Sequence, residues 1–312
     1  MILTVTMNPS IDMFYPIEHL KIDDVNRVSN VDKTAGGKGL NVSRVIALMG
    51  KSVTATGMVG GHFGEYIKDQ LTKVNIRHNF FQIDQESRNS IAILHDGGNQ
   101  TELLENGPTI LPVDAKKFKS FFEQLTEKFT LITMSGSLPK GLSIDFYTDL
   151  IKLAGSHQCK VLLDTSGDSL SGALQSAIKP DLIKPNEEEL EMLIKQKIDM
   201  TNDNAFKKAL QEPIFNGVEW IVVSLGAKGA FVRHNSRYYR VQIPKISVKN
   251  PVGSGDATLA GLAMAIDEGA SEKEILKMAM TMGLLNTMES RTGFVDPTQY
   301  QKYHDLVRVT GV

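Results

Sequence analysis

The stretch TLITMSGSLPKGLSIDFYTDLIKLAGSHQCKVLLD, residues 130–164, shows the pattern that decides the fold. It opens and closes with short aliphatic runs, 130–136 and 160–164, which are typical of buried strands. Between them, residues 143–154 have the periodicity of an amphipathic helix. Strands that are almost wholly apolar and that alternate with helices indicate a parallel sheet with both faces covered.

The same alternation extends over most of the chain. Further strands are predicted at 2–6, 52–59, 181–185 and 219–226. Further helices are predicted at 63–74, 112–127, 186–195, 255–268, 272–289 and 297–306. Ligands of such open sheets bind outside the carboxyl ends of the strands, and the Gly, Asp and Asn clusters of this sequence lie there.

Two stretches interrupt the alternation, residues 12–33 and about 89–106. Both read as short strands without an intervening helix, and HDGGNQ within the second is a plausible hairpin turn because glycine tolerates positive φ. We expect the two stretches to pair into a small accessory sheet; the alternative is that they are ordinary surface excursions.

Composition narrows the class of protein. With 312 residues, 41% hydrophobic and 22% charged, the chain is an ordinary globular protein. A net charge of −2 gives no field that would attract nucleic acid or a membrane. Cys159 is the only cysteine, so we expect a buried thiol and neither a disulfide nor a cysteine metal site. We expect no signal peptide and no membrane-spanning helix, and hence a cytoplasmic location.

The strongest local motif is NPVGSGDATLAGLAMAI, residues 250–266. Gly253 and Gly255 permit a tight turn before a helix, whose first N–H groups lack partners and attract anions. Asp256 would stand beside that anion site, positioned to take a proton from an attacking hydroxyl. The alternative is that Asp256 only caps the helix.

A second glycine-rich helix start is TAGGKGLNVSRVIALMG, residues 34–50. Lys38 lies among glycines that leave room for a substrate, and Asn41 falls on the first turn of the helix. The spacing matches neither a phosphate-binding Walker loop nor the dinucleotide fingerprint. A flexible turn explains the glycines equally well.

The third motif is IKPNEEELEML, residues 183–193, at the end of a strand and the start of a helix. Asn186 and Glu189 share one helix face and could hold Mg²⁺ through water. The alternative is that the same pair forms a capping box.

The fourth motif is EWIVVSLGAKGAFVRH, residues 219–234. Ser224, Gly226 and Gly229 follow a buried strand, where the backbone could pack against a nucleotide. A tight turn would need the same glycines.

Together and in this order, these motifs resemble the PfkB branch of the ribokinase-like carbohydrate kinases over essentially the whole chain. The resemblance is carried by NPSID (8–12), AGGKGLNVSRV (35–45), SGSLPKG (135–141), KPNEEE (184–189), SLGAKGA (224–230) and PVGSGDATLAG (251–261). Within the family the chain looks most similar to the tagatose-6-phosphate kinases and the 1-phosphofructokinases. Three stretches favour the tagatose-6-phosphate kinases: GNQTELLENGP (98–108), LLDTSGDSL (162–170) and GVEWIVVSLG (217–226).

The resemblance implies a three-layer α/β/α fold, with a mostly parallel central sheet and a small β-sheet lid. The main domain would comprise residues 1–11, 34–88 and 107–312, and the lid 12–33 and 89–106. It also implies ATP and Mg²⁺ as cofactors, a sugar-phosphate substrate and a homodimer formed through the lid.

Roles for single residues follow from the same resemblance. Asp256 would be the general base, and the amides of Gly253, Ser254 and Gly255 would form the anion hole. The sugar and its phosphate would be bound by Asp12, Gly37, Lys38, Asn41, Arg88 and, more weakly, Arg27. The nucleotide would be bound by Lys184, Asn186, Ser224, Gly226, Gly229 and Asn286, with Glu189 and Asn186 serving Mg²⁺ through water.

The implied reaction is phosphorylation of a hydroxyl of a ketohexose phosphate, with tagatose 6-phosphate giving tagatose 1,6-bisphosphate. The first alternative is the phosphorylation of fructose 1-phosphate. A non-catalytic sensor of sugar phosphates or nucleotides on the same fold is a more remote alternative, since a fold does not confer activity. A Rossmann dehydrogenase is disfavoured because the dinucleotide fingerprint is missing after the first strand. The preferred sugar, the oligomeric state, any dependence on monovalent ions and any allosteric ATP site stay open.

Overall fold

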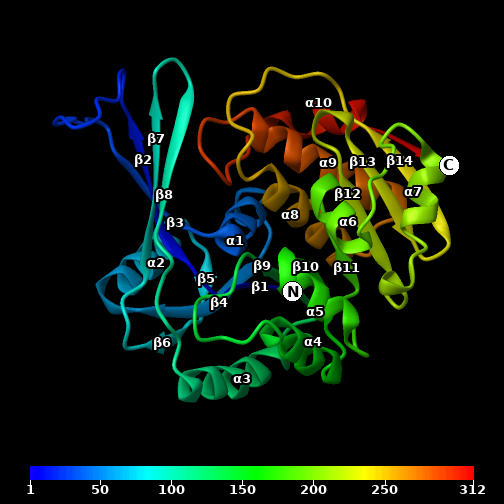
Figure 1. The fold of residues 1–312 in the computed structure, drawn as a ribbon, viewed down its shortest axis with the longest axis horizontal. Coiled ribbons are helices and arrows are strands. Elements are labelled where there is room, and N and C mark those ends of the chain that lie inside the picture. Colours follow the sequence, from blue (N-terminus) through cyan, green and yellow to red (C-terminus); the bar gives the residue numbers. More distant parts are fainter.

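The computed structural model describes residues 1–312 and contains two β-sheets, of which the larger has eleven strands (Figure 1). The predicted strands are confirmed as β1 (Ile2–Thr6), β4 (Val53–Gly60), β9 (Leu131–Ser135), β10 (Lys160–Asp164), β11 (Leu182–Ile183) and β12 (Trp220–Ser224). They pair in parallel in the order β12-β11-β10-β9-β1-β4. Two short strands that were not predicted, β5 (Arg77–His78) and β6 (Phe81–Ile83), pair with β4.

Helices cover both faces of this sheet, as the alternation of strands and helices predicts. One face carries α1 (Lys38–Leu48), α2 (Gly61–Lys73), α8 (Ser254–Asp267), α9 (Glu272–Thr287) and α10 (Tyr300–Leu306). The other carries α3 (Pro112–Thr126), α4 (Phe146–Ser156), α5 (Gly167–Gln175), α6 (Glu187–Ile194) and α7 (Asp203–Ala209). Of these, α5 and α7 were not predicted. Consecutive residues such as Ile2 and Leu3 enter opposite cores, so the fold has three layers.

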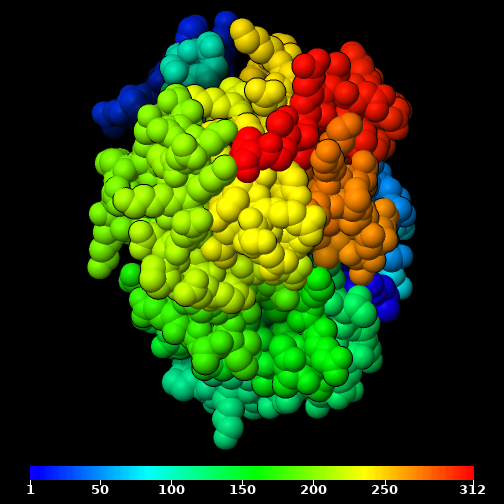
Figure 2. Space-filling model, turned by 90° about the vertical axis from the view of Figure 1, so that its right-hand side faces the viewer, coloured from blue at the N-terminus to red at the C-terminus, as the bar shows by residue number.

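The far edge of the large sheet is antiparallel. Strands β13 (Ala230–His234), β14 (Arg237–Gln242) and β15 (Arg308–Gly311) extend it beyond β12. The last residues of the chain therefore lie against the stretch around β14, as the red and yellow atoms in Figure 2 show. The sequence analysis predicted only helices after residue 255 and so omitted β15.

The predicted accessory sheet is confirmed as a four-stranded sheet, ordered β3-β2-β7-β8, that stands beside the main sheet (Figure 1). Its strands are β3 (Asp32–Gly36), β2 (Ser10–Pro16), β7 (Arg88–His95) and β8 (Asn99–Leu104). The predicted hairpin turn joins β7 to β8, with positive φ at Asp96, Gly97 and Gly98. The strands begin earlier or end later than the predicted segments, because β2 starts at Ser10, β7 at Arg88 and β3 continues to Gly36.

The single cysteine is buried, as the sequence predicts. Cys159 is a free, buried thiol, and its Sγ lies 3.0 Å from the backbone oxygen of Phe129. None of the helices is long and apolar enough to cross a membrane.

Candidate active site

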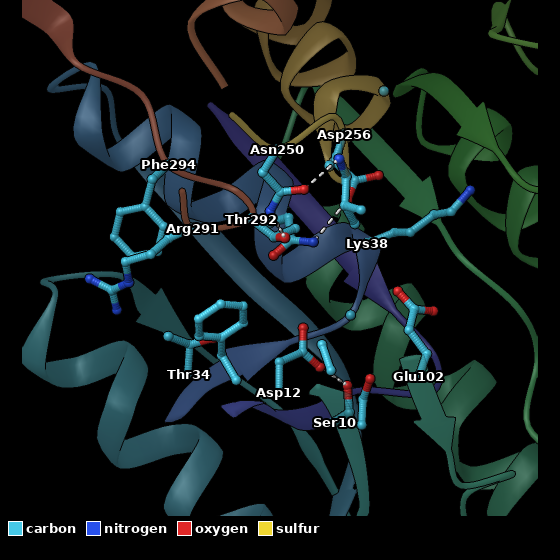
Figure 3. Close-up of a pocket in the computed structure, with 18 of the residues that line it drawn as sticks. Ser10, Asp12, Thr34, Lys38, Glu102, Asn250, Asp256, Arg291, Thr292 and Phe294 are labelled. Carbon is cyan, nitrogen blue, oxygen red and sulfur yellow. Dashed lines mark hydrogen bonds between the residues drawn. The ribbon is translucent and has the colours of Figure 1, made fainter. Parts of the chain in front are cut away.

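A cavity of about 530 Å³ lies between the carboxyl edge of the main sheet and the small sheet. Asp256 faces it from the start of α8, and Asp12 and Ser10 on β2 face it from the opposite side (Figure 3). Most of the predicted site residues line it: Asp12, Gly37, Lys38, Asn41, Arg88, Lys184, Asn186, Glu189, Ser224, Gly253, Gly255 and Asp256. Motifs from distant parts of the chain thus meet in one cavity.

The start of α8 has the geometry of an anion site. Gly253 has a φ of 82°, a left-handed conformation that favours glycine, and no side chain caps the helix. The Ser254 amide donates to the Pro251 backbone oxygen at 3.3 Å, whereas the amides of Gly255 and Asp256 have no partner within the protein. Gly255 lies close to the Lys184 ammonium group, since a Cβ at this position would be 3.1 Å from Lys184 Nζ. Two free amides and a cation therefore converge at the positive end of the helix.

Asp256 is buried, with 5% of its surface exposed. Burial first, and then the charge of Asp164, raises the pKa of Asp256 from 3.8 to about 6. Lys38, an amide hydrogen bond from Asn41 and Lys184 oppose that rise. The Asn41 bond joins Nδ2 to Oδ2 at 2.8 Å. A carboxyl group with a pKa near neutrality can accept a proton and release it again.

Asp164, the last residue of β10, is a site residue that the sequence analysis missed. Its Oδ1 lies 3.5 Å from Lys184 Nζ and 4.0 Å from Lys38 Nζ, and its Oδ2 is buried without a hydrogen-bond partner. The charge of Asp164 raises the pKa of Lys38. The sequence feature that could have identified Asp164 is its position at the carboxyl end of a buried strand, KVLLD.

Asn186 and Glu189 line the cavity and also cap α6. Asn186 Oδ1 accepts a hydrogen bond from the Glu189 amide at 2.8 Å, and Glu189 Oε2 accepts one from the Asn186 amide at 2.9 Å. The capping-box interpretation is confirmed. The Mg²⁺ role proposed for the pair stays a prediction.

A second cavity, of about 240 Å³, adjoins the first and has no hydrophobic residue in its wall. Gly37, Lys38 and Arg88 line both cavities. The rest of its wall follows the ends of β1, β9 and β10 and comprises Thr6, Asn8, Ser135, Gly136, Ser137, Thr165 and Ser166. The side-chain oxygens of Thr6, Asn8 and Ser135 have no partner. The sequence analysis missed these polar residues, although they lie at the ends of predicted strands or directly after them.

Arg88 is held in place by backbone oxygens. Its Nε donates to Asn8 O at 3.2 Å, and its Nη1 donates to Glu105 O at 3.1 Å. Its position at the start of β7 therefore directs the guanidinium to the boundary between the two cavities.

The small sheet supplies the remaining wall. Asp12 accepts a hydrogen bond from Ser10 Oγ at 2.6 Å, and burial raises the pKa of Asp12. Gly36 leaves the space that this carboxyl occupies, since a Cβ there would lie 1.9 Å from Asp12 Cγ. On β8, the alternate residues Gln100, Glu102 and Leu104 face the cavity, and they were not predicted as site residues.

Five predicted site residues do not line either cavity. One is Ser254, whose amide was predicted for the anion hole but already donates to Pro251 O at 3.3 Å. Arg27 is exposed between β2 and β3. Gly226 and Gly229 form a turn, and a Cβ at Gly229 would lie 2.0 Å from Val241 O. Asn286 is fully buried and uses its amide to hold the loop before α8, donating to Val252 O at 2.9 Å and accepting from the Gly293 amide at 2.8 Å.

Comparison with known proteins shows the family and the fold of the chain. Residues 5–299 match the model of the pfkB family carbohydrate kinases. Phosphofructokinase-2 from Escherichia coli, in complex with potassium, has 26% identity and a TM-score of 0.90, over 97% of this chain and 98% of that one. The same enzyme in complex with fructose-6-phosphate has 27% identity and a TM-score of 0.87, over the same shares. A possible 1-phosphofructokinase from Thermotoga maritima has 25% identity and a TM-score of 0.87, over 100% of this chain and 99% of that one.

The family match spans nearly the whole chain, and the structural likeness covers both sheets. The chain therefore belongs to the pfkB family and is an ATP-dependent carbohydrate kinase.

Proposed function

We propose that this protein transfers the γ-phosphoryl group of ATP to the free primary hydroxyl of a ketohexose monophosphate, with tagatose 6-phosphate as the favoured substrate and tagatose 1,6-bisphosphate as the product. One observation carries the proposal. The cavity that contains Asp256 continues, past Lys38 and Arg88, into a second cavity with an entirely polar wall. A substrate with a reactive hydroxyl at one end and a phosphate at the other fits this pair of cavities.

The second cavity would hold the phosphate that the sugar already carries. Lys38 and Arg88 provide positive charge, and unpartnered hydroxyls such as those of Thr6 and Ser135 provide donors. Cations and hydroxyl donors are the groups that bind a phosphate dianion in proteins. Asp12 and Asn41, in the first cavity, would bind sugar hydroxyls.

The first cavity would perform the transfer. Asp256 would accept the proton as the sugar hydroxyl oxygen bonds to the γ-phosphorus and the bond from that phosphorus to the ADP oxygen breaks. The free amides of Gly255 and Asp256 and the nearby Lys184 ammonium would stabilise the charge that spreads over the moving phosphoryl oxygens. Asn186 and Ser224 would lie along the ATP phosphates; adenine contacts by Gly226, Gly229 or Asn286 stay predictions.

Mg²⁺ is part of this proposal, and the residues present fit it. The buried Asp164 Oδ2 has no partner, and the Glu189 carboxylate lines the same cavity. No three His, Cys, Asp or Glu side chains converge, so the ion would be held mainly by water and ATP phosphates, as Mg²⁺ commonly is. When bound, it supplies positive charge that neutralises the ATP tail.

The preference for tagatose 6-phosphate is supported by the position of two of the distinguishing stretches. GNQTELLENGP contains β8, which places Gln100 and Glu102 on the wall of the first cavity. LLDTSGDSL contains Asp164, which lines the first cavity, and Thr165, which lines the second. Fructose 1-phosphate is the alternative substrate, since it presents the same two ends.

We also propose that the small sheet is a lid and that two copies of the chain associate through it. The proposed lid comprises residues 12–33 and 89–106, and the rest of the chain forms the main domain. The lid exposes large apolar side chains, among them Ile22, Val25 and Leu103, that a partner could cover.

The test is a substrate panel. The rate of ADP formation from ATP is measured with tagatose 6-phosphate, fructose 1-phosphate and fructose 6-phosphate, and kcat/KM is compared between them. The proposal expects tagatose 6-phosphate to give the largest value. A larger value for fructose 1-phosphate would select the alternative. ATP binding with no turnover on any substrate would point to a non-catalytic sensor.

A further inference from the structure

Arg44 is a buried cation to which the proposed mechanism gives no task. It lies on α1, one turn after Asn41, and only 4% of its surface is exposed. Its Nη1 donates to Asn41 Oδ1 at 2.9 Å and to Thr292 O at 3.3 Å, and its Nη2 donates to Ala35 O on β3. A buried arginine is costly unless it is fully paired, so a specific use is expected.

The bond from Arg44 decides which way the Asn41 amide points. A guanidinium can only donate, so the end of the amide that faces Arg44 must be the oxygen. The NH₂ end then faces Asp256 and donates to Oδ2 at 2.8 Å. If the amide were reversed, its oxygen would face the carboxylate, and the ionised form of Asp256 would lose a hydrogen bond and gain a repulsion.

Neighbouring backbone holds the pair in this arrangement. Gly293, at a φ of 72°, packs directly on it, and a Cβ there would lie 2.6 Å from Arg44 Nη1 and 2.8 Å from Asn41 Oδ1. The centre of the Phe294 ring lies 5.1 Å from the guanidinium carbon of Arg44. The segment that contains Gly293 and Phe294 therefore packs against this pair of side chains.

We propose that Arg44 is a positioning residue that acts through Asn41: it orients the Asn41 amide so that the amide donates to Asp256 and keeps the Asp256 carboxylate ionised and ready to accept a proton. The last clause rests on the proposed role of Asp256 as the base. The positioning itself does not depend on that role.

The charged groups around Asp256 also influence whether its carboxyl group is ionised. Lys38, on α1, and Lys184, after β11, favour the ionised carboxylate, and Asp164, at the end of β10, disfavours it. Arg44 keeps its charge, although burial lowers its pKa to about 10. Without the hydrogen bond from Asn41, burial and the charge of Asp164 would raise the pKa of Asp256 further.

The experiment compares Arg44→Met with Arg233→Met. Arg233 is the matched control, because it is also buried and donates to three backbone oxygens, those of Leu210, Phe215 and Val218, on the face of the sheet opposite to α1 and α8. Stability and the pH profile of kcat/KM, relative to the unmodified protein, are measured for both. A structural role alone would give both variants the same profile.

For Arg44→Met we expect the pKa of Asp256 to rise by about one, which is the effect of losing roughly one charge-assisted hydrogen bond. From a starting pKa of about 6, relative kcat/KM would fall roughly fivefold at pH 6 and less than twofold at pH 8.5. Arg233→Met would show no such dependence on pH. Equal losses at both pH values for Arg44→Met would overturn the proposal.

A second variant and a direct titration cover the case in which Arg44→Met does not fold. Asn41→Ala, which leaves Arg44 bound to Ala35 and Thr292, should move the acidic limb by the same amount. The ¹³Cγ signal of Asp256 should titrate about one pH unit higher in either variant. An unmoved titration would overturn the proposal. Because this signal needs no turnover, the result stands even if the proposed reaction proves wrong.

Discussion

The substitution Asp256→Asn should make the protein more stable while it removes the proposed base. Burial and Asp164 raise the pKa of Asp256 from 3.8 to about 6 in the folded protein. The folded state therefore binds this proton more tightly than the unfolded state, and ionisation costs stability. The cost is absent well below pH 3.8, grows as the pH rises, and is complete above about pH 6.

The size of the effect follows from the same two values. One pKa step corresponds to about 1.4 kcal/mol, so the ionised carboxylate costs roughly 3 kcal/mol at pH 8. At pH 4.5 the cost is only about 1 kcal/mol. Asparagine has the same shape and no charge, and it can still accept the hydrogen bond from Asn41. The gain in the free energy of unfolding should therefore be about 2 kcal/mol larger at pH 8 than at pH 4.5.

Urea denaturation of both proteins at the two pH values measures this difference, and the melting temperature should rise by roughly 5–10 °C at pH 8. Asp69→Asn is the control, because Asp69 is exposed on α2 and makes no hydrogen bond or ion pair. Its effect should stay within about 0.5 kcal/mol. The reasoning is refuted if Asp256→Asn gains equally at both pH values, or loses stability at pH 8.

Two further predictions concern the charges around the base. In steady-state assays at saturating ATP, Lys38→Ala should raise the KM for the phosphorylated sugar about tenfold to a hundredfold, because a charge-assisted contact with the phosphate is lost. An unchanged KM would show that Lys38 does not bind the sugar phosphate. Asp164→Asn should lower the pKa of Asp256, because the Asp164 charge raises it, so the acidic limb of the kcat/KM profile should move to lower pH. A limb that stays in place or moves upward would contradict the electrostatic account of the site.

Much of the fold was predictable because its strands are buried on both faces. The runs 2–6 and 160–164 match β1 and β10 to the residue, since short, mainly aliphatic runs suit strands whose two faces are both buried. By contrast, β15 is short and largely exposed, and it forms only because it pairs with β14 some 70 residues earlier in the chain, Thr310 opposite Arg240. No local pattern encodes such a pairing.

The site residues likewise fall into those that the sequence predicts and those that only the fold brings into the site. Asp256, Lys38 and Asn41 were predictable because glycine-rich helix starts mark anion sites along the chain. Asp164 read as the end of a strand, and only the packing of β10 beside β11 places its carboxylate 3.5 Å from Lys184. Arg44 was likewise missed.

Some roles transferred by resemblance stay predictions. Asn286 was predicted near adenine, and in the structure its amide holds the loop that precedes α8, which does not test that role. Arg27 lies on the surface of the small sheet region, outside the cavities. The domain boundaries, the association through the lid and the cytoplasmic location stay predictions.

The most direct test of the central claim is the rate of phosphoryl transfer from ATP to tagatose 6-phosphate by Asp256→Asn, measured at pH 7.5 with saturating substrates. The account predicts a folded protein, unchanged in its binding of ATP, whose kcat is lower by about 10²–10⁴-fold, the usual contribution of a general base. A kcat within a few-fold of that of the unmodified enzyme would show that the proton goes elsewhere, and the account of this site would be wrong.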